Sequence, residues 1–421
     1  MRYTARMKIK ADLVVKNASQ VFTSAGSPES PVVVEGGSVA VAGGLVAWVG
    51  KTERLADDVE VGPEAMVIDA AGGVVTPGFV DPHTHAVFAG SRPLEFEWRL
   101  SGRSYLDILA DGGGILATVN AVRQADEDQL VRESLPRLDR MLEFGVTTCE
   151  VKSGYGLDVE NELKLLRVAR KLASLTPMRI LPTFLGAHTF PPEFRDDHDK
   201  YVKLVIEEML PAVVEEGLAL ACDVYVEKGV FDVDQAEQIL RAATDSGLGI
   251  HVHAGQFVDL GGPEMAAGMG ASSVDHLDVV SDEGLAAMAR SGTVAVMLPG
   301  AAVSLGQKPP RVDRFLEAGV TLALATDLNP GTSYTENLPL MAFLSVTSMG
   351  LPCSAALLAI TRHAAKAVGL KEPEGTLAPG ARADLLIHDV SDWREILYHF
   401  GVTHVSKVLI KGKPVAGPRA S

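Results

Sequence analysis

The chain has 421 residues, of which 47% are hydrophobic and 22% charged, and its formal net charge at pH 7 is −16. This length exceeds that of one small domain and predicts either two domains or one barrel with additions. The acidic balance excludes a nucleic-acid partner, because a polyanion is repelled unless Lys and Arg are concentrated in a patch that this sequence lacks.

Cysteine usage and hydropathy bear on the cellular compartment. Cys149, Cys222 and Cys353 are odd in number and widely spaced, which fits neither a disulfide framework nor a zinc ribbon and predicts a cytoplasmic protein. The basic N-terminus is not followed by the apolar segment of a secretory signal. No apolar run reaches membrane-spanning length, so we expect no membrane partner.

Both ends of the chain carry short strand patterns separated by glycine pairs and polar turns, as hairpins require. The strand candidates are Ala11–Lys16, Ser38–Val41, Leu45–Gly50, Ala383–His388 and Val405–Gly412. Neither end has enough strands for a stable sheet of its own. We therefore predict one small β-sandwich domain built from residues 1–72 and 372–421.

The middle of the chain alternates apolar strands with amphipathic helical segments. The eight strand candidates are Val74–Val80, Thr147–Val151, Arg179–Leu185, Ala219–Val226, Gly249–His253, Ser273–Leu277, Thr293–Leu298 and Leu322–Ala325. This alternation predicts a parallel sheet buried on both faces, and eight units predict a TIM-like (β/α)₈ barrel over residues 73–371. A long insertion, Phe88–Gly114, follows the first strand and would lie over the mouth of the barrel.

Candidate metal ligands recur at the ends of these strands. His83 and His85 form a His-x-His motif, in which side chains i and i+2 share one face of an extended chain. The other residues that end or follow a strand are His188, His251, His253, His276 and Asp327. Because the carboxyl ends of barrel strands meet on one face, we expect these side chains to converge there.

One metal site can be assembled from His83, His85, His253 and Asp327. Three imidazoles and one carboxylate leave a position for water, and the set suits either zinc or iron. Such a metal lowers the pKa of water and supplies hydroxide at neutral pH. His251 shares the strand face of His253, so either could be the ligand. We choose His253 because it lies nearer the strand end, and His251 then packs or supports a ligand.

This ligand arrangement resembles the amidohydrolase superfamily, and four longer stretches resemble its imidazolonepropionase family. The stretches are Glu95–Leu100, Lys152–Leu157, Pro182–His188 and Asp327–Ser333. The resemblance implies a metal-dependent opening of the imidazolone ring of imidazolone propionate, which gives N-formimidoyl-glutamate in histidine degradation. It also implies a single metal ion per chain and substrate contacts from Arg92, Tyr155, His188, Gln256, Asn329, Gly331 and Thr332.

These residue types suit a small anionic substrate. Arg92 can form a two-pronged salt bridge with a carboxylate, and Tyr155 can donate a hydrogen bond from its hydroxyl. Asn329 can orient the ring. We expect Asp327 to take a proton from water, while His276 stabilises the developing oxyanion or shuttles a proton.

The sequence departs from the family at one point. Family members commonly carry a carboxylate after the fifth-strand histidine, in patterns such as His-Ala-Asp or His-Ala-Glu, whereas His253 is followed here by Ala-Gly-Gln. The amide of Gln256 can bind a ring but cannot act as a general base. More of the proton transfer then falls on Asp327 and His276. Glu227 is either a substitute acid or one half of an ion pair at the barrel mouth.

The sequence is also compatible with other functions and with a different metal site. The chain could be another cyclic amide or amidine hydrolase, or an aminohydrolase of the same superfamily, although Arg92 favours a substrate with a carboxylate. An inactive barrel that acts as a scaffold is disfavoured by the complete ligand set. Lys152 could be a carboxylated lysine that bridges two metals, but its surroundings in the sequence resemble the mononuclear family. A homodimer is compatible with a barrel enzyme of this class.

Overall fold

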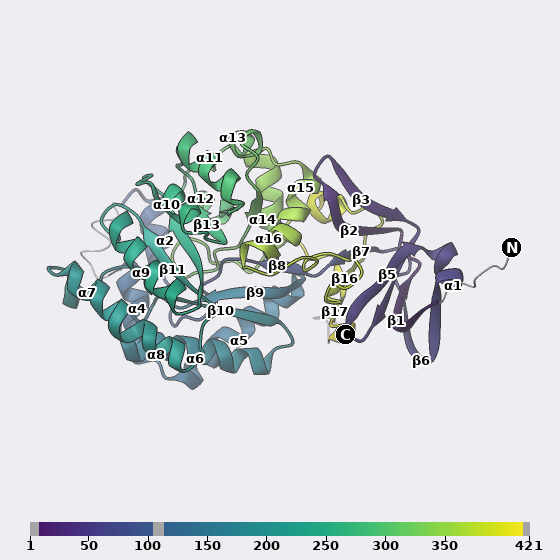
Figure 1. Cartoon of the computed structure of the whole chain (residues 1–421), viewed down its shortest axis with the longest axis horizontal. Helices are drawn as coiled ribbons and strands as arrows, with labels where there is room; N and C mark the ends of the chain where they lie inside the picture. Colours follow the sequence, from purple (N-terminus) through teal and green to yellow (C-terminus); the bar gives the residue numbers. More distant parts are fainter. Residues whose placement is uncertain (1–7, 104–112, 416–421) are drawn as a thin grey trace.

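The computed structural model describes residues 8–103 and 113–415. A strand-rich part, built from the two end segments of the chain, lies beside a larger α/β part (Figure 1). Residues 1–7 and 416–421 of the predicted terminal domain lie outside the described residues, as do residues 104–112 of the predicted mouth insertion.

The α/β part is the predicted barrel. Its strands are all parallel and follow one another in chain order around the sheet. They are β8 (Phe79–Asp81), β9 (Val146–Lys152), β10 (Arg179–Ala187), β11 (Ala221–Val226), β12 (Gly249–Ala254), β13 (Ser273–His276), β14 (Val294–Met297) and β15 (Leu322–Leu324). Both faces of this sheet are buried almost throughout, which explains the near-continuous apolar strand sequences.

The barrel closes just beyond the ends of its first and last strands. Thr84, after β8, forms a parallel bridge with Leu328, after β15. The backbone N–H of His85 donates to the carbonyl of Leu328 at 2.9 Å, and that of Asp327 donates to the carbonyl of His83 at 3.1 Å. Three of the four residues predicted to bind metal, His83, His85 and Asp327, therefore also lie at the seam of the barrel.

Most helical elements cover the barrel and connect its strands, whereas η1 and α1 lie between β5 and β6 in the strand-rich part (Figure 1). Those before β11 are η1 (Thr52–Arg54), α1 (Leu55–Asp58), α2 (Pro93–Leu100), α4 (Ile115–Gln124), α5 (Glu127–Glu143), α6 (Val159–Leu175), η2 (Pro192–Phe194), α7 (His198–Leu204), η3 (Val205–Met209) and α8 (Leu210–Glu215). Those after β11 are α9 (Val233–Asp245), α10 (Gly262–Gly268), α11 (Asp282–Ser291), α12 (Pro299–Ser304), α13 (Asp313–Glu317), α14 (Leu338–Leu344), η4 (Ser345–Met349), α15 (Cys353–Ala359), α16 (Arg362–Ala367) and α17 (Glu395–Tyr398).

Helix α9 shows how local sequence defines these elements. Asp232 caps its first turn, and Gln235 returns the hydrogen bond to the backbone of Asp232 in a capping box. The buried side chains are Ala236, Ile239, Leu240 and Ala243. Their spacing of three and four residues places one apolar stripe against the barrel, which fixes the face that the helix buries.

The terminal segments form two sheets that face each other across an apolar core. One sheet contains β1 (Ile9–Lys16), β4 (Gly37–Ala42), β5 (Leu45–Lys51) and β6 (Val59–Asp69). The other contains β2 (Gln20–Ser27), β3 (Ser30–Glu35), β7 (Val74–Pro77), β16 (Leu385–His388), β17 (Val405–Ile410) and β18 (Lys413–Val415). One core cluster joins Leu13 and Val39 of the first sheet to Val75 and Leu385 of the second, so the predicted sandwich is confirmed.

The structure corrects the first predicted barrel strand, Val74–Val80. That segment is two strands, because β7 pairs with β2 and β16 in the sandwich and only β8 enters the barrel. The chain changes sheets at Gly78, whose backbone N–H donates to the carbonyl of Asp384 at 2.8 Å. No helix among the described residues is both long and apolar enough to cross a membrane.

Candidate active site

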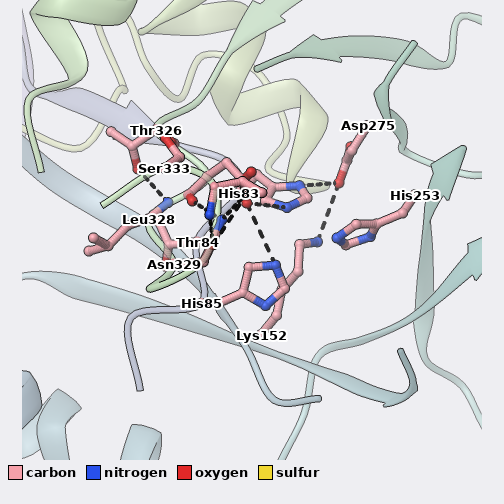
Figure 2. A network of polar contacts seen from close by, with 12 residues as sticks. His83, Thr84, His85, Lys152, His253, Asp275, Thr326, Leu328, Asn329 and Ser333 are labelled. Carbon is pink, nitrogen blue, oxygen red and sulfur yellow. Dashed lines mark hydrogen bonds and ion pairs between the residues drawn. The ribbon is translucent and has the colours of Figure 1, made fainter. Parts of the chain in front are cut away.

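Four of the predicted ligands meet at the carboxyl end of the barrel. The rings of His83 and His85 have centroids 5.3 Å apart, and the ring of His253, on β12, is centred 4.4 Å from that of His83. Asp327 follows β15 and places Oδ1 3.5 Å from Nε2 of His83 and 3.8 Å from Nε2 of His85. Figure 2 shows the three imidazoles directed toward one another.

Asp327 reaches this position through an unusual backbone conformation. Its φ of 51° lies in the left-handed region, which L-residues rarely occupy. Asp81, at the end of β8, fixes the preceding residue by accepting hydrogen bonds from the backbone N–H and the hydroxyl of Thr326 at 3.1 and 2.6 Å. These hydrogen bonds across the barrel seam help to maintain the strained backbone conformation of Asp327.

His276, predicted as a catalytic group, ends β13 and has a φ of 80°. Its ring is centred 5.4 Å from that of His253 and 5.8 Å from that of His83. Ligand nitrogens of these three residues lie within 4.8 Å of one another, as do the ligand atoms of His83, His85 and Asp327. The structure therefore adds His276 as a fifth group within reach of a metal.

The chemistry of these side chains fits a bound metal. Five buried ring nitrogens of these site histidines have no hydrogen-bond partner within the described chain: His83 Nε2, His85 Nδ1, both nitrogens of His253, and His276 Nδ1. Burial lowers the pKa of His83, His85 and His276 well below the ordinary value, so these rings stay neutral. Neutral imidazoles with free nitrogens around a carboxylate are the donor set that zinc or iron requires.

Three carboxylates that the sequence analysis did not assign lie beneath the histidines. Asp275 Oδ2 lies 2.7 Å from His83 Nδ1, and Asp223 Oδ2 lies 2.9 Å from His253 Nδ1. Glu150 Oε2 lies 2.8 Å from the Nζ of Lys152. All three side chains are fully buried. An acid within an otherwise apolar, doubly buried strand is the sequence signal that could have identified them.

The same three acids surround Lys152 and stabilise its charged form. Its ammonium lies among Asp223, Glu150 and Asp275, and although burial disfavours its charge, these acids raise the pKa of Lys152 above its ordinary value. A carboxylated Lys152 would place a fourth anion in this buried group. The geometry therefore argues against the metal-bridging alternative.

His188 and Tyr155 form one wall of the site. His188 follows β10 and stacks on His85, with centroids 5.1 Å apart and an interplanar angle of 10°. Its Nδ1 lies 2.9 Å from the carbonyl oxygen of Gly154, which holds the ring in place. The Tyr155 ring is centred 5.6 Å from that of His85. Burial raises the pKa of Tyr155, so its hydroxyl remains a hydrogen-bond donor.

His251, the alternative ligand, turns away from this centre. Its Nδ1 lies 3.1 Å from the Ser273 hydroxyl, beneath the metal-site histidines. Gln256 follows β12, and its Oε1 accepts a hydrogen bond from the Tyr225 hydroxyl at 2.6 Å. Glu227 accepts hydrogen bonds from the backbone N–H groups of three residues, Lys228, Phe257 and Val258. Glu227 therefore stabilises the loop after β12. Because its carboxylate is occupied by these hydrogen bonds, it is poorly suited to be the substitute acid.

The loop after β15 brings the last predicted contacts to the site. Asn329 organises this loop, because its Oδ1 accepts from the backbone N–H groups of Gly331 and Thr332 at 2.8 Å each. Arg92 caps α2 and lies against Gly331, where an added Cβ would fall 1.8 Å from Nη2 of the arginine. The Arg92 Nε is buried and has no hydrogen-bond partner among the described residues. Its Nη1 lies 3.6 Å from Glu95 Oε2, so the Nε is the donor that is left for an anionic group.

Comparison with known proteins identifies the family of this chain. The model of the amidohydrolase family matches residues 74–415. An imidazolonepropionase of Geobacillus kaustophilus is 46% identical over 96% of this chain and 97% of its own length. One of Myxococcus xanthus is 44% identical over the same shares. The chain belongs to the imidazolonepropionase family of amidohydrolases. It is therefore an enzyme, and a hydrolase.

Solved structures of lower identity share the fold. An adenosine deaminase from Xanthomonas campestris with bound zinc superposes with a TM-score of 0.75 at 17% identity, covering 98% of this chain and 94% of the other. An atrazine chlorohydrolase from Arthrobacter aurescens complexed with zinc gives a TM-score of 0.71 at 16% identity, covering 96% and 95%. These likenesses extend over the sandwich as well as the barrel, which marks the two-part architecture as a shared one.

Proposed function

We propose that the protein opens the ring of imidazolone propionate with water to give N-formimidoyl-glutamate, in keeping with its relatives, which are named imidazolonepropionases. The observation that carries the proposal is the convergence of His83, His85, His253 and Asp327, together with the buried, unpartnered Nε of Arg92 among the described residues. We assign one metal ion per chain to these four residues, either zinc or iron. When bound, the metal acidifies water and so supplies hydroxide near neutral pH.

The substrate would be held by its two ends. The Arg92 guanidinium, with its unpartnered Nε, suits the propionate carboxylate and explains how an acidic protein binds an anion. Tyr155 and His188 face His85 and can hydrogen-bond the ring. The loop that Asn329 braces through Gly331 and Thr332 closes the other side. Gln256 adds amide hydrogen bonds but no acid–base chemistry.

Two residues would move the protons. Asp327 lies buried beside the imidazoles of His83 and His85, and its carboxylate can take a proton from water and pass it on. His276 stays neutral and can donate a hydrogen bond to the oxygen of the ring carbonyl as the C–O bond to water forms. The amide C–N bond then breaks, and the proton goes to the departing ring nitrogen.

The test follows the imidazolone absorbance after metal-replete enzyme is added. Wild type should consume the chromophore without releasing ammonia, since ring opening only adds water. Arg92→Ala should lose about 10- to 100-fold in kcat/KM, mainly through KM, because a charge-assisted contact is worth about 1.5–3 kcal/mol. The matched control is Arg290→Ala, which removes an exposed arginine on α11.

Two outcomes would contradict the proposal. Ammonia release from purine-type rings, with no turnover of imidazolone propionate, would identify an aminohydrolase instead. Absence of both activities in a metal-free preparation that gains no metal on reconstitution would favour a scaffold. A cytoplasmic location and a homodimer remain predictions from the sequence, testable by fractionation and by sedimentation.

A further inference from the structure

Lys152 is the last residue of β9, and its side chain is fully buried. Its Nζ lies 2.7 Å from Asp223 Oδ2, 2.8 Å from Glu150 Oε2 and 3.3 Å from Asp275 Oδ2. The three carboxylates come from β9, β11 and β13. One ammonium group therefore joins three strands directly beneath the metal-site histidines.

Two of these carboxylates also contact the proposed metal ligands. Asp275 Oδ2 lies 2.7 Å from His83 Nδ1, and Asp223 Oδ2 lies 2.9 Å from His253 Nδ1. In each aspartate the oxygen that faces the histidine is the same oxygen that faces Lys152. Figure 2 shows the chain of contacts from His83 through Asp275 to Lys152.

The other oxygens of the carboxylates are already engaged. Asp275 Oδ1 accepts from the Ser273 hydroxyl at 2.7 Å, and Asp223 Oδ1 accepts from the backbone N–H of His253 at 3.2 Å. Glu150 Oε1 accepts from the Thr183 hydroxyl at 2.5 Å. Without Lys152, three acids would share one buried space with no cation between them, and mutual repulsion would push their inner oxygens apart.

The ammonium group of Lys152 lies where a metal ion could otherwise bind. Ligand atoms of Asp223, His253 and Asp275 lie within 4.8 Å of one another, a grouping that could hold a metal ion. Lys152 fills that position with a covalently attached cation. Its ammonium group offsets the negative charge of the carboxylates, but unlike a metal ion it cannot bind water or substrate as a ligand.

We propose that Lys152 is a positioning residue of the metal site, an internal cation that fixes Asp223 and Asp275 so that they orient His253 and His83. The inference rests on the proposed metal site. Asp275 accepts a hydrogen bond from Nδ1 of His83, and Asp223 lies in ion-pair contact with Nδ1 of His253. Each aspartate thereby directs the Nε2 of its histidine toward the proposed metal position. Losing such a support typically costs about 10- to 100-fold in metal affinity.

The experiment measures zinc affinity by competition with a chromophoric chelator, and ring tautomers by NMR of protein labelled with ¹⁵N-histidine. Lys152→Met removes the charge at similar length. Lys152→Gln also removes the charge but retains hydrogen-bond donors, and it serves if the methionine variant does not fold. The matched control is Lys164→Met on α6, whose half-buried ammonium donates to the carbonyls of Val122 and Ala125, away from the site.

Both Lys152 variants should bind zinc about 10- to 100-fold more weakly, and His83 and His253 should lose their single Nδ1–H tautomer in the metal-free protein. The Lys164 variant should keep wild-type affinity and tautomers. A Lys152 variant that melts at a lower temperature yet keeps both would show a merely structural role and overturn the proposal. Failure of wild type itself to bind metal would instead refute the proposed function on which the inference depends.

Discussion

The absence of a side chain at Gly331 decides where Arg92 can lie. The guanidinium occupies the volume that a Cβ would need, since Nη2 is 1.8 Å from the ideal Cβ position. Gly331 also donates its backbone N–H to Asn329, so the loop cannot easily move aside. The position of Arg92, the proposed anchor of the substrate carboxylate, therefore depends on residue 331 having no side chain.

Gly331→Ala should therefore displace Arg92 while leaving the fold intact. We expect KM for imidazolone propionate to rise about 10- to 100-fold, with a smaller change in kcat, because the lost contact is to a remote, non-reacting group. Steady-state kinetics across substrate concentration measure this split.

Gly268→Ala provides the matched control for that variant. Gly268 ends α10, and an added Cβ there meets nothing within 4 Å. This control should keep wild-type kinetics. An unchanged KM in Gly331→Ala would show that Arg92 does not anchor the substrate carboxylate.

Strands β7 and β16 bring Thr76 and His388 together inside the sandwich. Thr76 donates its hydroxyl to the carbonyl of Pro77 at 2.9 Å, so the Nε2 of His388, also 2.9 Å away, is the donor in their contact. The Nδ1 of His388 is then unprotonated, and it has no hydrogen-bond partner among the described residues. A proton added there would be buried without an acceptor.

This pairing predicts acid sensitivity of the sandwich. Burial lowers the pKa of His388 from the ordinary 6.5 to about 3. Below pH 6.5 the unfolded chain binds a proton that the folded chain does not, so stability falls as pH decreases from about 6.5 toward 3. The folded state should lose about 2 kcal/mol at pH 5 from this group.

Urea unfolding at pH 7.5 and pH 5 tests the claim with His388→Leu, which should lose about 2 kcal/mol less than wild type over this interval. His198→Leu, at an exposed histidine that begins α7, is the matched control and should follow wild type. If the two variants show the same pH dependence, acid sensitivity must come from other groups.

At the scale of the whole molecule, the proposed metal position lies on the seam of the barrel. His83 and His85 follow the first strand and Asp327 follows the last. Their segments are joined by the bridge from Thr84 to Leu328, by two backbone hydrogen bonds, and by the hydrogen bonds from Thr326 to Asp81. A metal bound by these three residues would link the two sides of that seam. Ligand binding to the folded state alone also stabilises it by mass action.

Metal removal should therefore lower global stability as well as activity. We expect chelation to lower Tm, and zinc at 100 times its dissociation constant to restore about 2.7 kcal/mol. Differential scanning fluorimetry across a zinc titration measures the shift. Magnesium should not substitute, because it prefers oxygen ligands to imidazole. An unchanged Tm on chelation, with metal loss confirmed by elemental analysis, would refute this link between site and seam.

The architecture could be predicted from the sequence because its signals are local and periodic. Apolar strands alternating with helical segments indicated the barrel, and each predicted barrel strand overlaps an observed one. Period-two geometry predicts that the side chains of His83 and His85 lie together, and the places of His253 and Asp327 at strand ends predict that they join them; the structure brings all four close together. The departure at Gln256 was likewise visible in the chain itself.

Only the tertiary structure reveals features that depend on contacts between segments far apart in the sequence. Val74–Val80 reads as one strand, and only the pairing partners at Gly78 reveal that β7 and β8 belong to different sheets. The roles of Asp223 and Asp275 were hidden because a buried acid is explained only by its partner, here Lys152 on another strand. Local periodicity records which face a residue occupies, whereas electrostatic partnership requires segments far apart in sequence to meet.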